Sequence, residues 1–406
     1  MIRIRLQTIL GLFVVAVGLV LTFVLGLFAY VKTTTKPLHP EAENLSWVSA
    51  SAPAPRWAAA VEQGRQISRG ALLEQNLPAL SVAVGAGGEV VWAEALGWAD
   101  IEEQARVTPH TRFRIGSAST MFTAAAAGLL IEKDRLKLDE KIQTYVPSYP
   151  EKQWPVTLRQ LMAHEAGVRS DAGDEEDVRS RCERTTDGLA RFAAAPLLFE
   201  PGTRFHYSTY GWMLVSAAIE NAAGEPFSAY MRKQIFEPLG MADTKLDSAT
   251  DVSTDTAASY FPRFAADTRY GPQEPDTLDY SCFSGATAFL STPSDMVRFG
   301  MALDSGTLLQ PATVQLLEAS QRLPSGDATG YGLGFDRETV TLAGAPRDLV
   351  VHDGEIRGGM VASFITFPER GVVVAVAANT SYADTAAVAL RLADVFAQPV
   401  STPVRK

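Results

Sequence analysis

Residues 113–130 read FRIGSASTMFTAAAAGLL, a short polar stretch that leads directly into an alanine-rich run. Alanine favours the helix, so the run predicts a helix that begins near Ser117. A serine at a helix start often serves as the N-cap, because its side-chain oxygen accepts a backbone hydrogen bond. Taken alone, Ser117 therefore has two interpretations, an N-cap residue or a nucleophilic hydroxyl.

Two further stretches carry the residue types of a polar site. Residues 199–210 read FEPGTRFHYSTY, a turn followed by the start of a helix, and residues 351–359 read VHDGEIRGG, a glycine-rich segment before the last apolar strands. By itself, the first pattern is typical of a buried aromatic residue near a helix cap, and the second is typical of a loop. Their meaning depends on their order after Ser117.

In this order and spacing, the three stretches resemble the motifs of the serine β-lactamase and DD-peptidase superfamily, and within it the class C and esterase-like branch. The resemblance covers about residues 57–398. Further family-like stretches are LRQLMAHEAG (158–167), EPLGM (237–241), LSTPSD (290–295) and YGLGF (331–335). YVPSYPEKQW (145–154) and Tyr207-Ser208-Thr209 are also similar to the mitochondrial serine β-lactamase-like branch and its bacterial relatives, which is associated with peptide hydrolysis.

The resemblance implies roles for residues of the first two motifs. In the family, a serine at a helix start attacks a carbonyl, and a lysine three residues later on the same helix face takes its proton. Ser117 would be this nucleophile. Tyr207 would approach the serine and pass protons, and Thr209, at a position that is usually asparagine, would contact the substrate.

The third motif of the family lines the opposite wall of the site on an edge strand. His352 and Gly354 match it, and the resemblance implies that the N–H groups of Ser117 and Glu355 form the oxyanion hole. Arg357 is either a partner for a substrate carboxylate or a solvated surface arginine. Residues next to each other in a strand point to opposite faces, so His352 and Asp353 are not expected to reach Ser117 together.

The family's lysine is missing, because Thr120 occupies its position and no other Ser-x-x-Lys occurs in the chain. A threonine hydroxyl carries no charge near neutral pH and is a poor proton acceptor. One hypothesis is a serine hydrolase that forms an acyl-enzyme on Ser117 and turns over slowly. The alternatives are a pseudoenzyme that binds a peptide or cell-wall fragment in the same cleft, and an altered copy of an active parent.

The flanking segments predict an α+β fold. A helix is expected over about 57–76, then a β-hairpin around Gly85-Ala86-Gly87-Gly88, and at the other end strands over 361–367 and 371–379 and a helix over about 384–397. The chain between them is largely helical. We expect one antiparallel sheet formed by the N- and C-terminal segments and flanked by helices, with a helical subdomain inserted.

The N-terminus predicts a membrane anchor. Residues 9–31 are almost continuously apolar, which is long enough to span a bilayer, and no small-residue cleavage site follows them. We expect a short cytoplasmic tail over 1–8, the span over 9–31, a linker over 32–56, the hydrolase domain over 57–398 and a tail over 399–406. The expected location is the inner membrane, single-pass, with the domain facing the periplasm or cell exterior.

Composition limits the partners. The chain of 406 residues has a formal net charge of −10 and no basic run, which disfavours nucleic acid. The only cysteines are Cys182 and Cys282, so a zinc site lacks ligands, while a disulfide and two free thiols are equally open. His164-Glu165 lacks the second histidine of a HExxH site. The expected ligand is a small acyl compound or peptide, without a cofactor or metal, and the oligomeric state is open.

Overall fold

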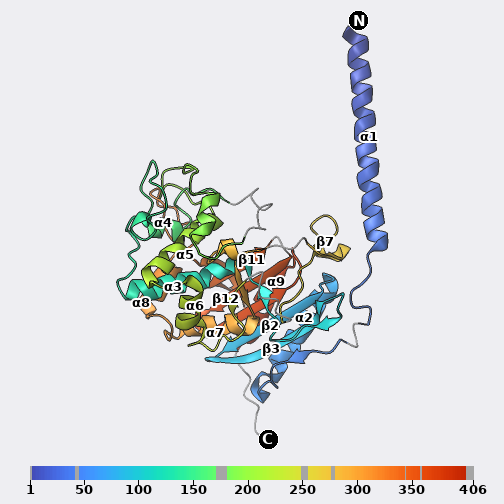
Figure 1. Ribbon diagram of the computed structural model, residues 1–406. Helices are drawn as coiled ribbons and strands as arrows, with labels where there is room; N and C mark the ends of the chain where they lie inside the picture. Colours follow the sequence, from blue (N-terminus) through green and yellow to red (C-terminus); the bar gives the residue numbers. More distant parts are fainter. Residues whose placement is uncertain are drawn as a thin grey trace.

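An antiparallel sheet joins the two ends of the globular part of the chain (Figure 1). The computed structural model describes residues 2–41, 45–170, 181–247, 255–275, 279–342, 344–356 and 359–398. The eight-stranded sheet has the order β1 (Val48–Ser49), β3 (Glu89–Asp100), β2 (Ala79–Ala86), β13 (Val372–Ala378), β12 (Met360–Phe367), β11 (Ala345–Ile356) and β10 (Asp336–Leu342), with β4 (Ala105–Arg106) beside β3. The expected α+β fold is confirmed.

The central strands are apolar because both of their faces are covered. Every residue of β2, β12 and β13 is buried. β13 joins the two terminal segments by pairing with β2, with Val376 opposite Val82. The predicted hairpin turns at Gly87 and Gly88, both of which have positive φ.

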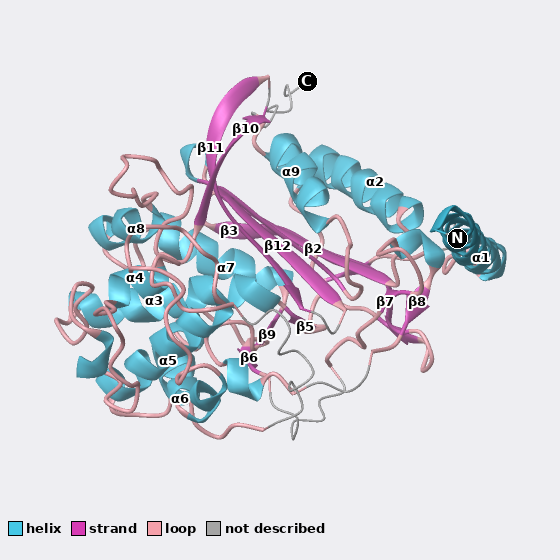
Figure 2. Cartoon of the chain, turned by 90° about the horizontal axis from the view of Figure 1, so that it is seen from above, coloured by secondary structure: helices cyan, strands magenta, loops and turns pink. Residues whose placement is uncertain are grey.

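Helices from the two ends of the domain cover one face of the sheet (Figure 2). They are α2 (Ala58–Glu74) and α9 (Thr385–Phe396), close to the predicted ranges. Their core includes Trp57, Trp92 and Phe396, with the rings of Trp92 and Phe396 stacked at 5.8 Å.

The helical subdomain lies on the opposite face (Figure 2). It contains α3 (Ser119–Glu132), α4 (Leu158–Met162), α5 (Thr209–Ala223), α6 (Phe227–Met231), α7 (Pro293–Asp304) and α8 (Pro311–Glu318). α3 is buried on nearly all sides, and this explains its alanine-rich composition, since small side chains let neighbouring elements approach. A small sheet of β5 (Phe113–Arg114), β9 (Phe289–Ser291) and β6 (Lys245–Leu246) lies at its base.

A disulfide joins Cys182 to Cys282, with their Cα atoms 4.8 Å apart. It closes a loop across a sequence separation of 100 residues and ties two segments that flank α5 in sequence. The alternative of two free thiols is therefore wrong.

The N-terminal helix α1 (Ile2–Thr34) extends away from the domain (Figure 1). Its stretch Thr8–Thr34 is apolar and long enough to cross a membrane. The described part of the segment expected to be a linker is not a free tether. Strand β1 pairs with β3, and the ring of His39 is buried with Nε2 2.9 Å from the carbonyl oxygen of Leu77.

Candidate active site

Ser117 lies in a short 3-10 turn, Gly116–Ala118, between strand β5 and helix α3. Gly116 adopts φ +55°, a conformation that glycine tolerates and that turns the chain from the strand into the helix. Neither the turn nor α3 has a side-chain N-cap hydrogen bond. The Ser117 hydroxyl instead donates to the carbonyl oxygen of Asp353 at 3.0 Å, so the N-cap interpretation is wrong.

Strand β11 meets this turn with its backbone. A Cβ on Gly354 would lie 1.9 Å from the carbonyl oxygen of Ile115, and one on Gly116 would lie 2.7 Å from that of Glu355. β10 covers β11 only as far as Val351, opposite Asp336, and therefore leaves the end of β11 open on that side. The stretch that by itself resembled a loop is thus a strand. It is an inner strand for most of its length and an edge only beside Ser117.

Thr120 and His352 face each other beneath Ser117. The Thr120 hydroxyl oxygen lies 2.5 Å from Nε2 of His352 and 2.9 Å from the carbonyl oxygen of Ser117. His352 Nδ1 lies 3.2 Å from the carbonyl oxygen of Asp353. The single proton of the Thr120 hydroxyl is donated to the Ser117 carbonyl oxygen. Burial lowers the pKa of His352 to about 4, and the ring is neutral at physiological pH.

Tyr331 is a site residue whose importance could not be recognised from the sequence. Its side chain is fully buried, with its ring 4.8 Å from that of His164 and 6.4 Å from that of His352. Its hydroxyl lies near Thr120 and Trp212. Burial raises its pKa well above the usual value, so it stays a neutral phenol.

Tyr207 is on the solvent side of this group. The residue is 40% exposed, and the centroid of its ring lies 4.2 Å from that of His164. His164 is held by the N–H of Ser208, which donates to Nδ1 at 3.0 Å, and burial lowers the pKa of His164 to about 3. Ser208 caps α5, and Thr209, its first residue, is buried.

The remaining candidates diverge. His352 is buried and Asp353 is exposed, so the two side chains point to opposite faces as expected for a strand. The exposed Glu355 accepts a hydrogen bond from the N–H of Tyr382 at 3.1 Å. Arg357 lies outside the described residues. Within the ranges that the structure describes, no group of three or more His, Cys, Asp or Glu side chains could hold a metal ion.

The family model described as "Beta-lactamase" matches residues 57–398. The chain belongs to the beta-lactamase family.

Relatives of this family are distant in sequence. The human mitochondrial serine beta-lactamase-like protein LACTB is 25% identical, and the match covers 88% of this chain and 84% of the relative. Penicillin-binding protein 4* of Bacillus subtilis is 24% identical, with 80% and 74% covered. The solved structure of EstCE1, a hydrolase with promiscuous acyltransferase activity, has a TM-score of 0.70 and 24% identity, with 84% of this chain and 99% of that chain covered. At this identity, the structural likeness establishes the fold only.

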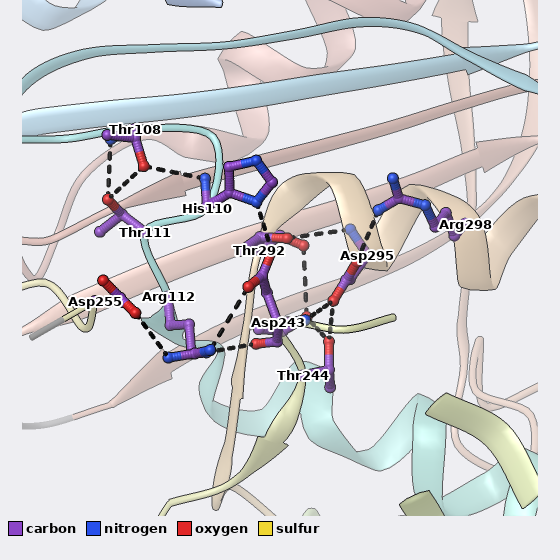
Figure 3. A network of polar contacts seen from close by, with 11 residues as sticks. Thr108, His110, Thr111, Arg112, Asp243, Thr244, Asp255, Thr292, Asp295 and Arg298 are labelled. Atoms are coloured by element: carbon purple, nitrogen blue, oxygen red, sulfur yellow. Dashed lines mark hydrogen bonds and ion pairs between the residues drawn. The ribbon is translucent and has the colours of Figure 1, made fainter. Parts of the chain in front are cut away.

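A polar network holds the segment just before β5 in place (Figure 3). Arg112, just before β5, lies between Asp243 and Asp255, and its Nε donates to the Asp243 carbonyl oxygen at 3.0 Å. Nδ1 of His110 lies 2.8 Å from the carboxylate of Asp243. Asp295 of the LSTPSD stretch accepts from the N–H of Asp243 at 2.9 Å. The stretch therefore positions β5 and has no contact with Ser117 in this network.

Proposed function

We propose that this protein is a membrane-anchored serine hydrolase that forms an acyl-enzyme on Ser117 and turns it over slowly. The observation that carries the proposal is the meeting of the Ser117 turn with the open end of β11. There a half-buried hydroxyl lies beside backbone groups of a strand edge. This arrangement suits attack on a carbonyl, with backbone N–H groups of Ser117 and Glu355 as the proposed oxyanion donors.

The chemistry requires a proton acceptor for Ser117. As its oxygen bonds to the acyl carbon, the hydroxyl proton must leave, and it finally reaches the departing alcohol or amine. The neutral ring of His352 is the nearby nitrogen base, and it is linked to the Ser117 turn through Thr120, which contacts the Ser117 carbonyl oxygen and not its hydroxyl. With a pKa of about 4 it is a weak base at neutral pH. Slow turnover follows from this weakness.

The substrate class is an acyl ester or amide, including a small peptide. Related structures include a D-stereospecific amidohydrolase from Streptomyces and a D-amino acid amidase from Ochrobactrum anthropi, which have 20% and 23% identity to this chain. Those activities belong to those proteins, and here they support only the general reaction. Thr209, His352, Gly354, Glu355 and Arg357 are the proposed substrate-binding positions.

The proposed location is the inner membrane, with α1 as a single span and the domain facing the periplasm or cell exterior. An 18-residue window of the apolar stretch of α1 is fully exposed, and the domain contacts only the end of the helix. The Cys182–Cys282 disulfide adds support, because such bonds persist in oxidising compartments and are rare in the cytosol.

The test is the intact mass of the full chain in detergent after incubation with a fluorescent penicillin or a fluorophosphonate. We expect slow addition of one label, abolished by Ser117→Ala and retained by Ser325→Ala, which changes an exposed serine. Absence of label in the native chain together with labelling of Thr120→Lys would contradict the hydrolase.

That second result would favour the alternative, a pseudoenzyme that binds a peptide or cell-wall fragment at the same site. The contacts of the Thr120 hydroxyl support this alternative, because they are to the Ser117 carbonyl and His352 and not to the Ser117 hydroxyl.

A further inference from the structure

The end of helix α1 is packed against a hairpin of the domain. This hairpin, residues 261–273, consists of β7 (Phe261–Pro262), β8 (Pro272–Gln273) and the turn between them. Its aromatic rings form a triangle with the helix, because Phe28 lies 5.9 Å from Phe264 and 5.6 Å from Tyr270, which are 6.0 Å apart. Both views show the hairpin beside the domain end of α1 (Figures 1 and 2).

Polar contacts reinforce this packing. The hydroxyl of Thr35 donates to the carbonyl oxygen of Tyr270 at 2.9 Å, and Arg263 donates to the hydroxyl of Thr34 at 2.8 Å. Each lies within one turn of the end of the helix. The hairpin is thus attached to α1 along more than a full turn, from Phe28 to Thr35.

Hydrogen bonds connect both the hairpin and the segment after α1 to the rest of the domain. Before the hairpin, the buried Tyr260 donates its N–H to the carbonyl oxygens of Asn379 and Gly359 at 3.0 and 3.3 Å. After α1, the N–H of Leu38 donates to the side chain of Asn76 at 2.8 Å. The helix direction is therefore fixed relative to the sheet by two separate connections.

The position of this contact along α1 places the hairpin at the surface of the bilayer that the helix would span. Lys32 is the first charged residue after the apolar stretch, and Phe28 precedes it by four residues, about 6 Å along the helix. With Lys32 among the headgroups, Phe28 and the rings beside it lie at the boundary with the acyl chains. Aromatic residues favour this boundary. The tip of the hairpin presents exposed Ala265 and Ala266 instead of charged residues.

The local charge favours anionic lipid. Residues 28–36 and 261–273 contain four basic residues, Lys32, Lys36, Arg263 and Arg269, and one acidic residue, Asp267, a net charge of +3 in a chain of −10. Glu74 of α2, which borders the same hollow as Lys32 and Arg269, lowers this local charge to +2. Basic residues beside a membrane are attracted to anionic headgroups, each by about 1 kcal/mol. Arg269 is also paired with Asp267 at 2.6 Å, which reduces its share of this attraction.

We propose that the 261–273 hairpin and the end of α1 together form a membrane-contact element that lies in the headgroup layer of an anionic bilayer and holds the domain against the membrane. This inference rests on the proposed anchoring by α1. The domain would then have a fixed orientation relative to the membrane, whereas a flexible linker would let it reorient.

The experiment uses the full chain with a single added thiol, Ala265→Cys, labelled with the fluorophore NBD, because the native cysteines are joined in the disulfide. The chain is reconstituted in phosphatidylcholine vesicles with and without phosphatidylglycerol, and quenching by nitroxide lipids is measured. The matched control is Glu89→Cys, an exposed position at the other end of β3 from Asp100. Glu89 lies about 36 Å along β3 from Asp100, which is at the end of the strand nearer the hairpin.

We expect severalfold stronger quenching at residue 265 than at residue 89, and the quenching at residue 265 should increase with phosphatidylglycerol. In Phe264→Asp, the quenching at the two positions should become equal while the chain stays in the vesicles. Equal, weak quenching at both positions in a chain that resists carbonate extraction would overturn the proposal and leave the anchor intact. Extraction of the chain by carbonate would overturn the anchor and this proposal together. Labelling of Ser117 by the fluorophosphonate in the same samples reports the hydrolase function separately.

Discussion

The Thr120 hydroxyl oxygen lies 2.5 Å from Nε2 of His352, although the two residues are 232 positions apart in the sequence. The contact joins the first turn of α3 to the end of β11, the two elements that meet at Ser117. Both side chains are almost completely buried and neither is charged at neutral pH, since burial lowers the pKa of His352. The position of the family's lysine is therefore occupied by a neutral hydrogen-bonded pair.

Thr120→Lys should increase the rate of Ser117 acylation. A lysine amine at this buried position gains a lowered pKa through desolvation, and a positioned base contributes about 10²–10⁴ to a rate. The measurement is the rate of fluorophosphonate labelling of the purified full chain, followed by intact mass.

Thr120→Val is the matched control, because it keeps the shape and removes the hydroxyl. It should bring no gain. A folded Thr120→Lys chain that labels no faster than the native chain would mean that the site lacks more than its base.

Gly354→Ala should destabilise the domain and abolish labelling at Ser117. The added Cβ would lie 1.9 Å from the Ile115 carbonyl oxygen and 2.6 Å from the Ala118 nitrogen, so β11 must move away from the Gly116–Ala118 turn. A loss of roughly 2–4 kcal/mol in the free energy of unfolding is expected, measured by urea titration.

Gly70→Ala provides the comparison for this variant. Gly70 lies in α2, and no atom lies within 4 Å of a Cβ added there. The Gly70→Ala variant should therefore gain up to about 1 kcal/mol in the free energy of unfolding. Native stability and labelling in Gly354→Ala would show that the close approach is not required.

The sequence predicts those parts of this fold that depend on local patterns. The apolar runs of β12 and β13 and the spacing of α2 and α9 correspond closely to the observed elements, because burial on a sheet or helix face imposes a period. Strand β10, which reads DRETVTL, is only half-buried and lacks the apolar run that would identify it.

Contacts between distant segments were harder to predict. The resemblance points to Ser117, Tyr207 and His352, yet the Thr120–His352 pair depends on where the end of β11 meets the α3 turn, and no local pattern encodes that distance. The sequence indicates Tyr331 only as part of the family-like stretch YGLGF. Its position beside Thr120 depends on how that loop packs. The packing of Phe28 on Phe264 joins two segments that each resemble ordinary apolar sequence.

Reduction of the Cys182–Cys282 disulfide should lower the thermal stability of the domain. The bond closes a loop of about 100 residues, and removal of such a bond typically costs about 2–5 kcal/mol. We expect a lower melting temperature with reductant for the native chain and no reductant effect for the Cys182→Ser, Cys282→Ser double variant. Titration of two free thiols in protein purified from an oxidising compartment would contradict the bond.

Glu318 should make the stability of the native chain fall as pH rises toward neutrality. Burial, with the nearby Asp304, raises the pKa of Glu318 from 4.5 to about 7, despite Arg337 at 3.7 Å. Between these values the folded chain keeps the proton and the unfolded chain releases it. Stability contributed by the protonated carboxyl is therefore lost as pH rises through this window, by at most about 3 kcal/mol.

Glu318→Gln isolates this contribution, because the amide stays neutral at every pH. Relative to the native chain, the variant should gain stability on going from about pH 5 to pH 8, as measured by urea titration at both values. Other buried groups that are not coupled to Glu318, such as His352, also titrate as the pH changes, and the comparison cancels them because both chains contain them. The control Glu151→Gln changes an exposed position, and its stability relative to the native chain should be nearly the same at pH 5 and pH 8. An equal change in stability for the native chain and Glu318→Gln would show that this carboxyl is already ionised in the folded protein at pH 5.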